Sequence, residues 1–413
     1  MINKIKVTDN LGQFIIALIP ISLLIGTALS ESLIVLLIIT FIIKIIQTRD
    51  LLIFKKKIFY LLMLIWLSLI INSYIALDLG ISALRNFTFF KYILMILAFI
   101  SFFDLKKKII FYTWFLTIFI VIIDIYFEFF IGHNLFGVRS HDPNRVASFL
   151  GKELKIAHFI IGFGFLSLSF LIEFNKKNLD KYKPIYNLFL LIIIIGIFIT
   201  GERANFIRGL LFTLILMYFI NKNHLNKFIF TFLLALIIFF SVLNFERIEN
   251  KFYSQIIKNV YDNGFSKYFK ESQYGAHFDT AKKIFEKYPF FGVGNKNFRV
   301  ECQNEDYYNP SYKLSHARCS THPHQIYYEL LSEHGILGTF VIISIIFYLI
   351  FKNSIIYFKK KNLIHLSSLL FTAITFLPLI PSGSFFSSFG ATIFWINFAI
   401  MCNIYEKLQK KIN

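Results

Sequence analysis

The sequence predicts an all-α polytopic membrane protein with about twelve transmembrane helices. Hydrophobic residues make up 56% of the 413 residues and charged residues only 16%, whereas a soluble globular protein carries about 25% charged residues. Apolar runs of about twenty residues recur along the whole chain, which is typical of membrane-spanning helices. Three cysteines are too few for a disulfide-stapled secreted domain.

Twelve runs are long enough to cross about 30 Å of hydrocarbon at about 1.5 Å per residue, allowing for tilt and ragged ends. No internal repeat of the kind that builds many transporters is visible. The predicted spans are residues 11–29, 32–48, 58–76, 84–103, 108–131, 154–174, 184–200, 205–221, 227–244, 334–352, 361–380 and 388–405.

The distribution of basic residues predicts the orientation of these spans, because Lys and Arg favour cytoplasmic loops. With the N-terminus inside, 23 of the 43 basic residues fall on the inner side, whereas the short outer links 29–32, 77–83 and 381–387 hold none. An even number of spans places both termini inside. The inner segments are 1–10, 44–57, 104–108, 175–183, 221–227, 352–362 and 406–413. The net charge of +19 is therefore attributed to basic residues that set the membrane topology and to others that bind an anionic ligand. It is not attributed to nucleic-acid binding.

A long outer loop divides the chain into three parts. Residues 1–244 hold helices one to nine, residues 245–333 form the loop, and residues 334–413 hold helices ten to twelve and a cytoplasmic tail. A loop of this length in a compact protein is usually functional. Its sequence has helical stretches of its own, such as residues 276–291, so we expect a helical cap on the membrane.

The arginines lie almost entirely on the predicted outer side. Arg49 is inner, and the other eight are Arg85, Arg139, Arg145, Arg203, Arg208, Arg247, Arg299 and Arg318. Topology needs only positive charge, whereas the planar guanidinium grips phosphate or carboxylate bidentately. The asymmetry therefore points to an anionic ligand on the outer face; structural ion pairs with Asp and Glu are the alternative for any single arginine.

Three of these arginines, and one pair of charged residues within the spans, stand out. Arg203 and Arg208 begin span eight; five residues apart, they lie on different faces of a continuous helix and converge only if residues 201–205 form a turn. Arg145 precedes span six, with Glu153 eight residues on. Lys91 and Asp124 lie at equal depth in spans four and five, which predicts a buried ion pair.

The segment 320–340 is the most specific in the chain. Pro323 suits the first position of a helix, which would make His322 the N-cap and put His324 in the first turn. Tyr327, Tyr328 and the following Leu331 lie on the same face as His324, and Glu329 and Glu333 follow. The helix dipole disfavours imidazolium there, so His324 would stay neutral, as a general base must. A capping or solvated histidine is the alternative interpretation.

No metal site or cofactor is expected from the sequence. His322 and His324 are separated by a proline and have no acidic partner at ligand spacing. There is no P-loop, GxGxxG or GxSxG element. The glycines of GVGNKNF (292–298) are interpreted as a turn that presents backbone near the site.

Four segments, in this order along the chain, resemble elements of the O-antigen ligase and polymerase superfamily. They are RVASFLGKELKIAHF (145–159), TGERANFIRGLL (200–211), YPFFGVGNKNF (288–298) and HPHQIYYELLSEHGILG (322–338). Each is degenerate alone, but their order and spacing match, as does the plan of twelve spans with one large late loop. The likeness covers residues 130–345 best.

The resemblance implies a GT-C-like glycosyltransferase of the bacterial inner membrane with its active face in the periplasm. Members transfer a glycan from undecaprenyl diphosphate to a sugar hydroxyl, with inversion and without a metal. Arginines hold the diphosphate and a histidine of the periplasmic loop helps to activate the acceptor. By position Arg203 matches the arginine and His324 the histidine, and Arg208, Arg145 and Arg299 are further candidates for the diphosphate. Supporting residues are Glu153, His277, His322, Tyr327, Tyr328 and Glu333.

One departure concerns a second phosphate contact. Many members carry an arginine about a dozen residues before the element at 288–298, where this chain reads SQYGAHFDTAKK. His277 is the nearest candidate there, and Arg299 or Arg208 are the alternatives.

The predicted function is that of an O-antigen ligase, which attaches the glycan to lipid A core during lipopolysaccharide biosynthesis. The long, well-formed late loop favours this over an O-antigen polymerase, which uses the same donor and a lipid-linked glycan acceptor. A flippase or secondary transporter fits less well, because such proteins have pseudo-symmetric halves and charges along a central path.

Cys302 and Cys319 both fall in the large outer loop, and Cys402 lies in span twelve. If the loop faces the oxidising periplasm, the first two are expected to form a disulfide. The bridge would tie the segment after GVGNKNFR (292–299) to the start of the helix predicted within residues 320–340. Two unpaired thiols are the alternative.

Overall fold

The computed structural model describes residues 2–105, 107–151 and 153–409, and all regular structure within them is helical. Lys106 and residues 410–413, which the inner-side count includes, lie outside this range. The helices are α1 Ile2–Ile25, α2 Thr27–Thr48, α3 Lys57–Tyr74, α4 Leu79–Thr88, α5 Phe90–Phe102, α6 Lys108–Ile131, α7 Ile156–Phe174, α8 Leu179–Ile199, α9 Arg203–Ile220, α10 His224–Asn244, α11 Glu246–Ile248, π-helical η4 Glu249–Lys258, α12 Asn259–Glu271, α13 Gln273–Lys287, α14 Phe298–Glu301, α15 Ile326–Lys360, α16 Leu363–Thr375 and α17 Ser388–Gln409, with short 3₁₀ turns η1 Leu52–Lys55, η2 Ser148–Leu150, η3 Lys176–Asn178, η5 Glu305–Tyr307 and η6 Ser315–Ala317.

The transmembrane character of the chain is confirmed. Eleven of the described helices are long and apolar enough to span a membrane, with α4 and α5 together forming one of them. α7 and α17 lie at the centre of the bundle and are buried over most of their length, whereas α10 is largely exposed. A helix that is apolar all round suits the centre, where other helices surround it.

The predicted span 361–380 is wrong in its extent. α16 covers only Leu363–Thr375, about 20 Å at about 1.5 Å per residue, which is short for a bilayer. The chain leaves the helix before Pro378 and Pro381, since proline removes the backbone donor that a helix needs. Residues 376–387 instead form an extended loop, called here the α16–α17 loop.

The predicted ion pair between Lys91 and Asp124 is also wrong. Lys91 pairs with Glu31 at 2.5 Å, whereas Asp124 accepts hydrogen bonds from the backbone N–H of Leu135 at 2.7 Å and from the hydroxyl of Ser148. Equal depth in the membrane was not sufficient to make Lys91 and Asp124 neighbours, because their helices have different partners. α5 packs on α2 and α17, and α6 packs on α1, α7 and α8.

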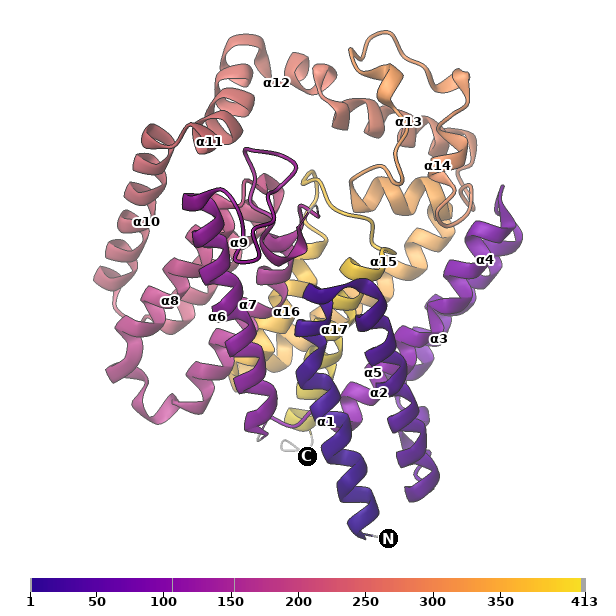
Figure 1. The fold of residues 1–413 in the computed structure, drawn as a ribbon. Helices are drawn as coiled ribbons and strands as arrows, with labels where there is room; N and C mark the ends of the chain where they lie inside the picture. Colours follow the sequence, from indigo (N-terminus) through magenta and orange to yellow (C-terminus); the bar gives the residue numbers. More distant parts are fainter. Residues whose placement is uncertain (1, 106, 152, 410–413) are drawn as a thin grey trace.

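The outer segment forms an arch over the bundle (Figure 1). It runs from α10 through α11 and α12 to α13 and α14, at the end of the molecule opposite to both chain termini. α13, Gln273–Lys287, confirms the helix expected within residues 276–291 and packs against α15. The arch thereby returns to the bundle at α15.

Two glycines join this arch to α15. Gly335 interrupts α15 with φ +60°, and a Cβ there would lie 2.3 Å from the carbonyl carbon of Phe290. Gly292 has φ +69°, and a Cβ there would lie 2.4 Å from the backbone of Glu333. Glycine alone tolerates both the positive φ and the contact. The kink lets Ile336 N–H donate to the Pro289 carbonyl at 2.8 Å. Within GVGNKNF, Val293 N–H donates to the Ser332 carbonyl at 3.0 Å and Gly294 N–H to the Glu333 carbonyl at 2.9 Å, so this segment is fixed to the helix.

The topology predicts that reporter fusions at Ser266 and at Lys361 lie on opposite sides of the membrane. Ser266 is in α12 and Lys361 directly follows α15, whose 25 residues after the kink span about 37 Å at about 1.5 Å per residue. Paired alkaline phosphatase and fluorescent-protein fusions at each position measure this, and activity of the same reporter at both positions would contradict this topology.

Candidate active site

The helix that was predicted to begin at His322 and His324 begins later in the structure. α15 starts at Ile326, and the N-cap is Gln325, whose side-chain oxygen accepts from Tyr327 N–H at 2.8 Å and Tyr328 N–H at 3.0 Å. The expectation of His322 as N-cap and His324 in the first turn is therefore wrong. His324 has φ +59°, which is incompatible with a right-handed helix, so both histidines precede the helix in an irregular segment.

Three histidines meet at this segment. The ring of His324 lies 4.1 Å from that of His322 and 5.2 Å from that of His277, which comes from α13. Tyr274, one turn earlier in α13, places its ring 5.9 Å from His324. The Nε2 of His324 and the hydroxyl of Ser320 are 3.0 Å apart. The structure thus brings His277 to the histidine segment.

The tautomer of His277 follows from its partner. Its Nδ1 lies 2.8 Å from the carbonyl oxygen of Arg318, and a carbonyl can only accept, so Nδ1 carries the proton. Nε2 then holds a lone pair, and this buried atom has no hydrogen-bond partner among the described residues. The α13 side of the cluster therefore offers an unsatisfied acceptor.

Burial lowers the pKa of all three histidines, and repulsion from neighbouring histidines adds to it at His322 and His324. Burial is the largest cause at His324, followed by His322 and His277, and together they lower its pKa to about 3. Burial also lowers the pKa of His322 and of His277. All three rings are therefore neutral at pH 7, and the main cause is desolvation instead of the helix dipole expected from the sequence.

A disulfide and one arginine hold the segment that leads to these histidines. Cys302 and Cys319 are bonded, with their Cα atoms 5.3 Å apart, as the sequence predicts, and Cys402 is a buried free thiol. Arg318 is buried; its Nε donates to the Cys302 carbonyl at 3.1 Å and its Nη2 pairs with Glu305 at 3.0 Å. Arg318 is thus a structural arginine.

The α16–α17 loop crosses the site and was missed at the sequence level. Ser382 N–H donates to the His324 carbonyl at 2.8 Å, and the Ile380 carbonyl accepts from Nη2 of Arg208 at 3.4 Å. Tyr327 donates its hydroxyl proton to the Phe376 carbonyl at 2.7 Å. The prolines, glycine and serines of PLIPSGSFFSS (378–388) interrupt the apolar pattern, and this signal could have identified a loop instead of a span end.

Arg208 is a buried cation without an acidic partner. It is 6% exposed, and its other contact is Asn205 Oδ1 at 3.5 Å. Among the described residues no carboxylate lies within 4 Å of its guanidinium, and its buried Nε has no partner. A buried charge normally requires a counter-charge, so the site is suited to an anionic ligand.

Arg203 and Arg145 lie at the same end of the bundle. The turn comes before Arg203, with Gly201 at φ +73°, so Arg203 and Arg208 share one continuous helix and do not converge through a turn between them. Nη1 of Arg203 donates to the Lys251 carbonyl and to Gln255, both at 3.4 Å. Nη2 of Arg145 donates to the Leu154 carbonyl at 2.9 Å, and its buried Nε has no partner among the described residues.

Glu202 and Glu153 supply the acids near these arginines. Glu202 is buried and accepts from Ala157 N–H at 2.8 Å and from the Asn205 amide at 2.6 Å. Burial raises its pKa, and the charge of Arg145 opposes that rise. Glu153 pairs with Lys155 at 2.9 Å, with no contact to Arg145 within 4 Å.

The remaining candidates have mostly structural contacts. Nη2 of Arg299 donates to the Thr321 carbonyl at 3.2 Å, next to His322. Glu333 accepts backbone hydrogen bonds from Lys296 at 2.8 Å and from Phe298 at 3.3 Å, so its carboxylate holds the GVGNKNF segment. Tyr328 stacks on Phe278 with ring centroids 4.8 Å apart. Among the described residues no group of three His, Cys, Asp or Glu side chains could hold a metal ion.

Comparison with known families supports the class of protein that the sequence predicts. Residues 188–343 match the protein-family model described as O-Antigen ligase. This match confirms the resemblance to the O-antigen ligase and polymerase superfamily. No curated protein matches the chain. The O-antigen ligase family implies a glycosyltransferase-like membrane enzyme that acts on a lipid-linked glycan and an acceptor.

The O-antigen ligase match covers only part of the arrangement described above. It includes α9 with Arg203 and Arg208, the arch with His277 and Arg299, and the segment of His322 and His324. Arg145, Glu153 and the α16–α17 loop lie outside it. The structure thus adds a contact between the matched region and a loop that follows it by more than thirty residues.

The disulfide predicts a specific loss of order in the outer segment. Replacing both cysteines, Cys302→Ser with Cys319→Ser, opens a loop closed over 17 residues, which is worth about 3 kcal/mol. Limited proteolysis should then cleave residues 299–324 faster than in the wild-type protein. Cys402→Ala is the control and should leave this region resistant. Alkylation of Cys302 and Cys319 in the unreduced wild-type protein would contradict the disulfide itself.

Proposed function

We propose that the protein is an O-antigen ligase of the bacterial inner membrane. It transfers a glycan from undecaprenyl diphosphate to a sugar hydroxyl of lipid A core on the periplasmic side, with inversion and without a metal ion. The family match supports the general class. The observation that carries the finer proposal is the α16–α17 loop, which hydrogen-bonds to His324 on one side and to Arg208 on the other.

The donor diphosphate binds at the arginine side in this proposal. A diphosphate leaving group gains negative charge as the glycosidic bond breaks, and fixed guanidinium groups stabilise that charge without reorganisation. Arg208 is buried and has no carboxylate partner among the described residues. Arg203 lies one and a half turns before it on α9 and approaches the diphosphate from the outer end. Arg145, with its unpaired Nε, and Arg299 assist.

The acceptor hydroxyl meets His324 on the other side of the loop. A neutral imidazole can accept the hydroxyl proton, or orient the hydroxyl by a hydrogen bond. With a pKa of about 3, His324 holds a proton only weakly in the free protein. The negative charge of a bound diphosphate raises that pKa through electrostatic attraction, so donor binding and proton acceptance are coupled.

A deletion strain tests the acceptor assignment. Loss of a ligase should leave lipid A core without any attached glycan, while lipid-linked glycan accumulates. Gel electrophoresis of lipopolysaccharide with core-specific and glycan-specific detection measures both species. Core that carries a single repeat unit would instead indicate an O-antigen polymerase, and unchanged lipopolysaccharide would contradict both.

Two histidine variants test the proposed chemistry. His324→Asn keeps a residue that tolerates positive φ but removes the imidazole, so turnover in glycan transfer should fall by about 10²–10⁴. His322→Ala should cost less, because His322 supports the site through its ring contact with His324 and its hydrogen bond with the Thr321 hydroxyl. Transfer is measured with purified protein and lipid-linked donor. Near-normal transfer by His324→Asn, with inactive His322→Ala, would assign the chemistry to the other histidine.

A further inference from the structure

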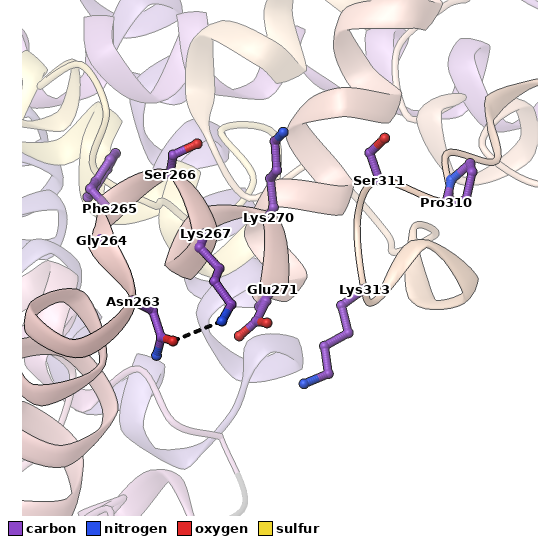
Figure 2. A pocket seen from close by; sticks show the side chains of 10 residues that line it. All are labelled: Asn263, Gly264, Phe265, Ser266, Lys267, Lys270, Glu271, Pro310, Ser311 and Lys313. Atoms are coloured by element: carbon purple, nitrogen blue, oxygen red, sulfur yellow. Dashed lines mark hydrogen bonds between the residues drawn. The ribbon is translucent and has the colours of Figure 1, made fainter.

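A hollow of about 750 Å³ lies in the arch, and none of the histidines and arginines described above lines it. Its walls are the α12 end and the loop after η5, and Figure 2 shows the side chains that line it. We propose that this lysine hollow binds a phosphate group of the saccharide acceptor; the proposal rests on the proposed function. The lining residues are Asn263, Gly264, Phe265, Ser266, Lys267, Lys270, Glu271, Pro310, Ser311 and Lys313.

The hollow carries an excess of positive charge. Three lysines, Lys267, Lys270 and Lys313, line it together with one acid, Glu271. Among the described residues none of the three ammonium groups lies within 4 Å of a carboxylate, and the one hydrogen bond found is from Lys267 to Asn263 Oδ1 at 3.0 Å. Most other lysines of the arch do pair, for example Lys251 with Asp142 at 2.7 Å.

Backbone contacts set the positions of these lysines. Lys313 N–H donates to the Lys270 carbonyl at 3.1 Å, so the segment around residue 313 is fastened to α12. α12 kinks at Gly264, which has φ +74° and ψ +155°. At the other end, a Cβ on Gly275 would lie 2.1 Å from the Phe269 carbonyl oxygen, so α13 packs tightly behind the hollow. Two chain segments therefore supply the three lysines that line the hollow. Figure 2 shows the Lys267 and Lys313 side chains extending to the same side and the Lys270 side chain to the other.

The hollow lies next to the histidine cluster along the chain. Glu271 ends α12, and Tyr274, three residues later in α13, contacts the ring of His324. Phe265, which is 70% exposed, adds an apolar surface at the rim. An acceptor whose hydroxyl reaches His324 can thus place a neighbouring part of its chain in the hollow.

The chemistry of the lining favours a phosphorylated sugar. Lysine ammonium groups bind phosphate as mobile point charges, without the fixed geometry that a guanidinium imposes. The two unpaired cations that extend to the same side, Lys267 and Lys313, suit a doubly charged group, and the aromatic ring of Phe265 suits a sugar ring. The donor diphosphate could supply the same charge, but we place it at the buried arginines, so the hollow is assigned to the acceptor.

Binding of a defined probe tests this assignment in the full-length protein in detergent. The probe is the deacylated core oligosaccharide carrying its phosphates, and the comparison probe is the same oligosaccharide after phosphatase treatment. Lys267→Gln with Lys313→Gln should weaken binding of the phosphorylated probe about tenfold, since each lost ammonium removes a charge-assisted contact. Binding of the phosphatase-treated probe should not change.

A matched variant controls for bulk charge. Lys258→Gln with Lys282→Gln removes the same charge from exposed positions of the same arch, outside the hollow, and should change binding less than twofold. The proposal would be overturned if both double variants lost affinity for the phosphorylated probe equally, or if neither lost any. It would also be overturned if the affinity for the phosphatase-treated probe fell equally. If the Lys267 and Lys313 variant weakened the binding only of undecaprenyl-diphosphate-linked glycan, the hollow would be assigned to the donor. That result would also overturn the proposal.

The outcome is separable from that of the proposed function. Binding of the probe does not need glycan transfer, so lysine-dependent binding in a protein that transfers no glycan would refute the ligase proposal alone. In an active protein, the Lys267 and Lys313 variant should raise the KM for the acceptor about tenfold and leave kcat and the KM for the donor unchanged. An unchanged acceptor KM would refute the hollow alone.

Discussion

The buried carboxylate of Glu329 is the interaction on which the outer half of the structure depends. It lies in the first turn of α15, is fully buried, and pairs with Lys296 of the GVGNKNF segment at 3.3 Å. It also accepts from Phe385 N–H at 2.9 Å and from the hydroxyl of Ser384, in the α16–α17 loop. One side chain thus joins three segments that are far apart in sequence. Such a buried pair is costly to break, because either charge left alone would be desolvated without compensation.

This junction explains why the histidine segment can adopt an unfavourable backbone. His324 has φ +59°, and a non-glycine residue in that region persists only when its surroundings hold it. The disulfide fixes the chain before His324, Gln325 caps the helix after it, and Ser382 binds its carbonyl. The same loop contacts Arg208, so the position of a histidine ring and that of a buried guanidinium depend on one short stretch of backbone.

Hydropathy predicted most of the fold, because long apolar runs have few alternative structures. The disulfide was accessible for a similar reason, since only two cysteines lie in the outer loop. The residues at the site were harder. Pro323 suggested a helix start, but the amide of Gln325 provides the cap, and the conformation of His324 comes from tertiary contacts. The contact of His277 with His324 and the role of residues 376–387 depend on segments that no local pattern relates.

In the proposed mechanism His324 and Arg208 act as one site, held together by the α16–α17 loop. A double-mutant cycle on the rate of glycan transfer tests it most directly, with Arg208→Lys, His324→Asn and the two combined. Residues that act as a unit are strongly non-additive, so the double variant should be only slightly slower than the slower single variant. A double variant slowed by the product of the two single effects would show independent sites and contradict the account.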